Sequence, residues 1–320
     1  VPLVGAASFA VLEVVGAKAE LDRVWEVDES VQDLVALSEL RTRLLDEQNW
    51  TAAESGMEQL GLTPSIVVAF TGIDVPEEAA EAAVRVDELT EDLSLGEVEA
   101  TLSDIRAATD RPLSETGGRY QELEYSIALM SQERLDRVMS VAGEVSDSGA
   151  LIESLQILEA ATIARQSISA EFNHFFGAQF SEFVSRSDEL KALIGRAKVR
   201  EEAMAKISRL VSAESVTRST LDIIDASDSA QAFDAAATDL VDESLSGPAE
   251  EAALTAVLAD LDEVARTFQD SSAATGLYVE LVNAAGEDVY ESSSAASDRA
   301  QRRNERAIIA LAALALASVA

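Results

Sequence analysis

The sequence predicts an all-α protein made of elongated up-and-down helical bundles, two of them side by side. Hydrophobic residues form 48% of the chain but aromatic residues only 5%, so the apolar content is mostly Ala, Leu, Val and Ile. Five prolines and 15 glycines among 320 residues leave room for long helices. No long stretch alternates apolar and polar residues as a half-buried strand would, and the short β-like run at 276–282 is isolated within helical sequence.

Capping and breaking residues set the expected order of the elements. A long helix is expected over 18–56, followed by a loop at 61–64. Two Asp/Ser-x-x-Glu capping boxes, at 74–77 and 94–97, predict helix starts because their side chains bind free backbone N–H groups. The remaining elements are expected to be a helix to 108, a break at 112–118, a helix over 119–145, a turn at 146–149, helices over 150–176, 179–212, 214–225 and 229–246, a break at 247–248, and one last long helix.

The charge and the rare residue types exclude several function classes. A net charge of −35 argues against direct binding to nucleic acid or to an anionic bilayer surface. The chain has no cysteine and one histidine, so disulfides, thiol nucleophiles and two-histidine metal motifs are ruled out. Glu171 and His174 have the Glu-x-x-His spacing of di-iron bundles, but such sites need two of these motifs. We expect no enzyme activity, catalytic residue, metal or cofactor within this chain.

Both ends of the chain are apolar. The runs at 1–17 and 307–320 are each shorter than the ~20 residues that span a bilayer. We interpret them as the end of one membrane helix and the start of another, around a sensor domain at 18–306 with bundle regions at 18–145 and 146–306. Such ends should extend beyond the folded body and lie near each other. The alternative is that both ends are hydrophobic helix ends packed on the body.

The side of the membrane depends on two opposing observations. Four arginines precede the last apolar run, and the positive-inside rule would place them in the cytoplasm: Arg299, Arg302, Arg303 and Arg306. The acidic composition and the absence of cysteine favour the outside. We therefore expect a cell-membrane protein with this domain outside the cytoplasm.

A polar interruption in one apolar seam marks a candidate ligand site. The seam is spaced as the buried face of a bundle helix and consists of Leu151, Leu155, Leu158, Thr162, Arg165, Ser169 and Phe172. A buried arginine is costly without a negative partner, which could be an internal glutamate or an anionic ligand between helices. The alternatives are a structural salt bridge or an Arg165 side chain that reaches the surface.

The first long helix offers a counterpart to this seam. Arg41 and Gln48 share a face with Leu37, Leu44 and Thr51, and Leu40 and Glu47 lie on the adjoining face. Two helices with polar groups in mid-seam could enclose a polar pocket. We therefore predict a ligand site of Arg165, Thr162, Ser169, Gln48 and Arg41, in which Arg165 points toward the first helix near Gln48. The alternative is that Arg41, Glu47 and Gln48 face water.

Several segments resemble the nitrate- and nitrite-sensing (NIT) domain of bacterial receptors, over about residues 25–270. Residues 98–172 resemble its second half, and 232–238 resemble its aromatic, Ala-rich segment. On the helix at 158–165, Glu159 and Arg165 match the family pattern, while Leu158 and Ala164 depart from it. Residues 44–52 resemble the signature of the first helix, with Gln48 in place of its arginine.

The resemblance implies a function and a set of partners. NIT domains hold a small anion between helices and drive histidine kinases, diguanylate cyclases or chemoreceptors across the membrane. Here Arg165 would bind the anion; since Gln48 supplies no charge, either Arg41 or Arg43 compensates or the ligand is a different small molecule. We expect a ligand-sensing receptor domain, a homodimer joined to the membrane through both ends. The alternative is a ligand-free helical scaffold or dimerisation module.

Overall fold

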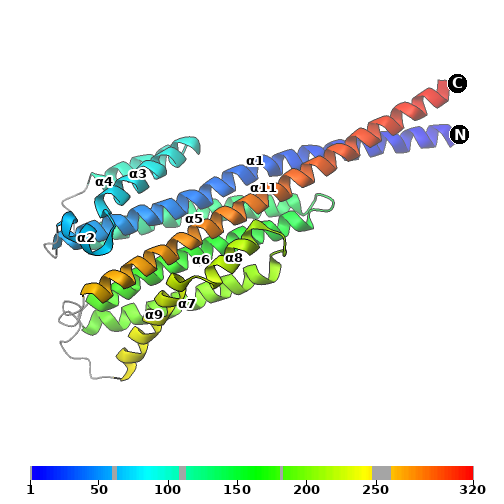
Figure 1. Ribbon diagram of the computed structural model, residues 1–320. Coiled ribbons are helices and arrows are strands. Elements are labelled where there is room, and N and C mark those ends of the chain that lie inside the picture. Colours follow the sequence, from blue (N-terminus) through cyan, green and yellow to red (C-terminus); the bar gives the residue numbers. More distant parts are fainter. Residues whose placement is uncertain (1, 60–62, 108–112, 181–182, 247–260, 320) are drawn as a thin grey trace.

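A computed structural model describes residues 2–59, 63–107, 113–180, 183–246 and 261–319, and over these ranges the chain forms ten helices and no strand (Figure 1). The predicted all-α bundle is therefore confirmed. The helices of the first half are α1 (Pro2–Gln59), α2 (Pro64–Thr71), α3 (Val75–Asp92), α4 (Gly96–Arg106) and α5 (Leu113–Ala142). Those of the second half are α6 (Gly149–Phe180), α7 (Phe183–Leu210), α8 (Val216–Asp225), α9 (Asp228–Ser246) and α11 (Leu261–Val319).

Local capping was predicted correctly at one box and wrongly at the other. The Asp74 carboxylate caps α3 by accepting a hydrogen bond from the Glu77 backbone N–H at 3.4 Å. Ser94 does not cap α4: Leu95 precedes that helix without a side-chain cap. Ser94 has a φ of 56°, so it belongs to the left-handed turn that reverses the chain after α3.

One other local prediction was also wrong. The break expected at 112–118 ends before residue 113, because α5 begins at Leu113 and includes Gly117 and Gly118. The β-like run at 276–282 lies within α11, in agreement with the expected last long helix, and its Tyr278 and Leu281 are buried against neighbouring helices. Burial on a helix surface outweighs the strand preference of such residues. The break expected at 247–248 lies outside the described residues.

Two helices of 58 and 59 residues, α1 and α11, form the long axis of the molecule. At 1.5 Å per residue each extends for roughly 90 Å. They run antiparallel and side by side beyond the body, so both termini lie at the same pole (Figure 1). This confirms the expected placement of the two ends, and it corrects the expected first helix, which spans more than 18–56. Among the described residues, no helix has a stretch that is long and apolar enough to cross a membrane.

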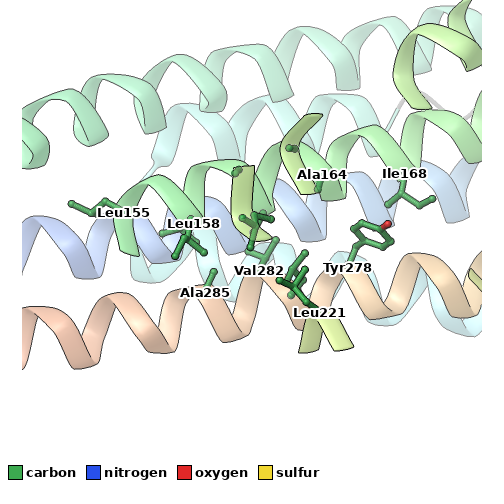
Figure 2. Close-up of a cluster of buried hydrophobic side chains, with 14 of the residues drawn as sticks. Leu155, Leu158, Ala164, Ile168, Leu221, Tyr278, Val282 and Ala285 are labelled. Atoms are coloured by element: carbon green, nitrogen blue, oxygen red, sulfur yellow. The ribbon is translucent and has the colours of Figure 1, made fainter. Parts of the chain in front are cut away.

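The two bundle regions share one large hydrophobic core. That core includes Val27, Val31 and Leu34 from α1 together with side chains of α5 to α9 and α11. Figure 2 shows its centre, where Leu155, Leu158 and Ile168 of α6 meet Tyr278 and Val282 of α11. A second core joins α1 to α3, α4 and α5 through residues such as Leu40, Val86, Leu102 and Ile127. The helix α1 therefore belongs to both cores and links the two halves.

Close contact between α1 and α11 depends on a glycine. A Cβ atom on Gly286 would lie 3.1 Å from Val35 Cγ1, whereas one on Gly276, ten residues earlier on the same helix, would meet nothing within 4 Å. Farther along the pair, the Ser293 hydroxyl donates a 2.9 Å hydrogen bond to the Asp28 carboxylate. These contacts fix the register between the two helices.

Gly276→Ala and Gly286→Ala form a matched pair that tests this contact. Replacing a mid-helix glycine by alanine stabilises a helix by about 1 kcal/mol where there is space. We expect that gain at Gly276 and a smaller or reversed effect at Gly286, because the new methyl group presses on Val35. Thermal unfolding of the two variants measures the difference. Equal stabilisation by both substitutions would contradict the close packing of α1 on α11.

Candidate functional site

The Arg165 side chain lies where α6 meets α1, and none of it is exposed to solvent. Its Nη2 donates a hydrogen bond to the Asp46 carboxylate on α1. Its Nε and Nη1 have no hydrogen-bond partner among the described residues. Burial lowers the pKa of Arg165, and the charge of Asp46 acts in the opposite direction. The prediction of a buried Arg165 directed at the first helix is confirmed, and its contact is Asp46 rather than Gln48.

The two hydroxyl residues of the predicted site have different roles. The Thr162 hydroxyl donates to the Leu158 carbonyl at 2.9 Å, so its proton is used within α6. The Ser169 hydroxyl accepts a 2.7 Å hydrogen bond from the Asn49 amide of α1. Asn173 then donates to the Asn49 side-chain oxygen at 2.9 Å. Ser169 therefore joins α6 to α1, as Arg165 does.

The predicted residues of the first helix are not brought together with Arg165. Arg41 donates from Nη2 to the Glu124 carboxylate of α5 at 3.0 Å, and Gln166 donates to the same oxygen at 2.7 Å. Gln48 is half-buried and makes no hydrogen bond within the described part of the chain. The alternative that Arg41 and Glu47 face water is wrong, because Arg41 is mostly covered and Glu47 is buried.

Two cavities flank the contact between α1 and α6. The first, of about 260 Å³, lies between α1, α5 and α6 and contains Arg41 and Thr162 among its lining residues. The second, of about 290 Å³, is bordered by α1, α3, α6 and α11. Asp46 and Asn49, the partners of Arg165 and Ser169, line this second cavity. Of the predicted site residues, Arg41 and Thr162 line the first cavity and none lines the second, which is reached only through Asp46 and Asn49.

Two buried glutamates hold the helices around this contact. Glu47, 2% exposed, accepts hydrogen bonds from Arg106 Nε at 2.7 Å and Nη2 at 2.9 Å, and from the Tyr120 hydroxyl at 2.7 Å. Its hydrogen bond and charge raise the pKa of Arg106. Burial first, and the Glu47 charge second, raise the pKa of Tyr120. This cluster ties α1 to α4 and α5.

The second glutamate repeats the chemistry in the other half. Glu171, 1% exposed, accepts from Arg200 Nε at 2.7 Å and Nη2 at 2.9 Å. Arg200 also donates to the Tyr278 hydroxyl at 3.1 Å and to Asp234 at 2.6 Å. Burial alone lowers the pKa of Arg200. The hydrogen bond with Glu171 and the electrostatic effect of Tyr278, Glu171 and Asp234 outweigh burial, so the pKa is raised overall. This cluster ties α6 to α7, α9 and α11.

Neither cluster was predicted from the sequence, although the chain contains a signal for them. Arg41, Glu47 and Asn49 on α1 have the same spacing as Arg165, Glu171 and Asn173 on α6. In both copies the glutamate is buried under an arginine, and the two asparagines meet at the contact between the helices. A search for internal repeats would have marked these glutamates as structural.

The two residues of the Glu-x-x-His spacing have separate partners. Glu171 is bound by Arg200, while His174 Nδ1 lies 2.7 Å from the Glu189 carboxylate of α7. Within the described ranges no three His, Cys, Asp or Glu side chains are grouped as metal ligands. The arrangement around Arg165 instead offers hydrogen-bond donors in a region shielded from water, which suits the binding of an acceptor group.

Comparison with known proteins returns no match: no family model fits the chain, and neither a curated protein nor a solved structure is similar to it.

Glu171→Gln and Glu47→Gln test the two buried clusters. Each substitution removes the buried charge from an arginine and leaves it an exposed aspartate, Asp87 for Arg106 and Asp234 for Arg200, so we expect a loss of about 1.5–3 kcal/mol in the free energy of unfolding. Urea unfolding followed by circular dichroism measures it. Glu88→Gln on the exposed face of α3 is the control and should change stability little. Losses as small as that of the control would contradict a structural role for the clusters.

Proposed function

We propose that this chain is the extracytoplasmic ligand-sensing domain of a transmembrane signalling receptor, such as a histidine kinase, diguanylate cyclase or chemoreceptor. A small anion or other small molecule would bind between helices. The observation that carries the proposal is the fully buried guanidinium of Arg165 at the meeting point of α6 and α1, two of whose nitrogens have no partner in the part of the chain that the structure describes.

The chemistry of Arg165 supports an acceptor ligand. Buried N–H groups are almost always hydrogen-bonded, and leaving them unpaired is costly. Asp46 satisfies only one nitrogen of Arg165 and also lies 3.6 Å from Arg43. A carboxylate, nitrate or similar group would add charge-assisted hydrogen bonds to Arg165. The resemblance to NIT domains points to the same residue and the same kind of ligand.

The long helices supply a route for the signal. The contact of Arg165 is on α1, and α1 runs beside α11 to the pole where both termini lie (Figure 1). Packed helices shift by about 1–2 Å in many switching proteins. A ligand that changes the α1–α6 contact would therefore displace α1 against α11 at that pole.

The surface of the protruding helices supports attachment to a membrane. The side chains that are buried there include Ala10, Ala300 and Ala307, while large apolar side chains point outward, with Leu12 70% and Leu316 75% exposed. Small residues between helices and large apolar residues outside are typical of membrane-embedded pairs. Arg303 is one of the four arginines that precede the last apolar run. It pairs with Glu20 and Asp147, so it forms ion pairs within the domain. The proposal also includes that this domain lies outside the cytoplasm and that it forms a homodimer.

A ligand-free scaffold or dimerisation module is the second candidate. The pairing of Arg165 with Asp46 favours it, since a structural ion pair needs no ligand. The two candidates differ in what small anions do to the folded domain.

Arg165→Ala separates them. We expect a panel of small anions that includes nitrate, nitrite and acetate to raise the melting temperature of the native domain, because a ligand of the folded state stabilises it by mass action. The substitution should abolish that shift. Arg218→Ala, at a half-buried arginine of α8 whose partner is Asp222, is the control and should retain it. A domain that Arg165→Ala destabilises and that no anion stabilises would favour the scaffold.

Vesicle flotation tests the membrane part of the proposal. We expect the native chain to float with neutral phosphatidylcholine vesicles through its outward apolar side chains. The double variant Leu12→Glu and Leu316→Glu should stay with the soluble fraction, because charged groups resist transfer into the bilayer. Val84→Glu, on the exposed surface of α3, should float as the native chain does. Equal flotation of all three, or of none, would contradict attachment through the protruding helices.

A further inference from the structure

The second cavity combines charges of both signs with an aromatic wall. Its charged lining residues are Arg43 and Asp46 of α1, Arg85 of α3 and Glu280 of α11. Its aromatic lining residues are Trp50, Phe172 and Phe268. All three rings are half-buried, and they contact one another with centroids 6.2 Å apart for Trp50 and Phe268 and 5.5 Å apart for Phe172 and Phe268.

The register of α1 against α11 separates the two kinds of residue. The contacts of Asp28 with Ser293 and of Val35 with Gly286 are seven residues apart on each helix. If this spacing continues for another seven residues, Thr42 and Val279 lie at the same level, and Arg43 and Glu280 lie within about one turn of each other. Trp50 lies about two turns beyond Arg43 on α1, and Phe268 lies about three turns beyond Glu280 on α11. The cavity therefore has a charged end and an aromatic end.

The charged groups at this end lack close partners. Arg43 is 3.6 Å from Asp46 and 3.9 Å from Glu39, and Arg85 is 4.0 Å from Glu81. These distances exceed the roughly 2.7–2.9 Å of charge-assisted hydrogen bonds. Arg106 and Arg200, by contrast, contact carboxylates at 2.6–2.9 Å. Glu280 is exposed and makes no hydrogen bond or ion pair within the described residues.

From this arrangement we infer that the second cavity binds a free α-amino acid with a large apolar, preferably aromatic, side chain. The ligand carboxylate binds Arg43 and Arg85, its ammonium group binds Glu280, and its side chain packs on Trp50, Phe172 and Phe268. The volume of about 290 Å³ is at the small end of ligand pockets, as a single amino acid requires. This inference rests on the proposed sensor function and names the class of a ligand that binds beside Arg165, next to its partner Asp46, rather than on the Arg165 nitrogens.

The location links the ligand to the contact already described. Asp46 lies in the cavity and binds both Arg165 and Arg43. A ligand carboxylate that takes Arg43 leaves Asp46 to Arg165 alone and so changes the α1–α6 contact. Because the cavity also includes α11, the same ligand contacts both helices that run to the pole of the termini.

Three probes of the same shape separate the contributions of the two ligand charges: L-phenylalanine, 3-phenylpropionate and 2-phenylethylamine. Calorimetry on the whole chain should find L-phenylalanine tighter than either analogue by roughly tenfold, the ratio that one charge-assisted hydrogen bond supplies. Glu280→Gln should remove the preference for L-phenylalanine over 3-phenylpropionate and leave the affinity for 3-phenylpropionate unchanged. Arg43→Gln should weaken both. Glu287→Gln, an exposed glutamate of α11 outside the cavity, should retain the native preference.

The outcomes of these experiments test the amino-acid ligand and the sensor function separately. Equal affinity for L-phenylalanine and 3-phenylpropionate, or strongest binding of 2-phenylethylamine, would overturn the amino-acid assignment. So would a chain that responds to nitrate but not to L-phenylalanine, and in that case the sensor function stands. If neither these probes nor any inorganic anion binds, the sensor function itself fails. Unchanged native preference in Glu280→Gln would also overturn the assignment of the ammonium contact.

Discussion

The contact between Arg165 and Asp46 is the constraint around which the molecule is organised. A guanidinium that has lost all its water is unfavourable unless negative groups surround it. One carboxylate, on the neighbouring long helix, meets only part of that need, so α6 is held to α1 at this point and two nitrogens have no partner among the described residues. Asn49 extends the polar contact to Ser169 and Asn173, which fixes the rotation of the two helices against each other.

Buried ion pairs on both sides of this contact join α1 and α6 to the other helices. On one side Glu47 joins α1 to α4 and α5, and on the other Glu171 joins α6 to α7, while Arg200 continues the second cluster to α9 and α11. Both glutamates are buried and fully engaged by arginine and, for Glu47, tyrosine. The contact between α1 and α6 therefore has firmly bound neighbours but is itself incompletely paired. A change at Arg165 would consequently move one half against the other rather than loosen either half.

Much of this fold could be predicted from the sequence, because periodicity and scarce helix breakers are local properties. The seam of α6 and the burial of Arg165 followed from residue spacing alone. The position of the first turn of α5 and the absence of a Ser94 cap did not, since neighbouring helices decide them. The partner of Arg165 also could not be predicted: Asp46 and Gln48 lie on the same helix two residues apart, and only the rotation of α1 selects between them. The burial of Glu47 required knowledge of Arg106, which lies on a different helix.

The central claim is that a ligand near Arg165 displaces α11 against α1. Since the chain has no cysteine, spin labels can be placed at Asp22→Cys on α1 and Glu287→Cys on α11, two exposed positions offset along the helix axes. Pulsed electron paramagnetic resonance then measures the distance between the labels with and without saturating nitrate or L-phenylalanine. We expect a change of about 1–2 Å on binding, and none when Arg165→Ala is present as well. The ligand must first be shown by calorimetry to bind. If the distance distribution is then identical with and without that ligand, the account is contradicted.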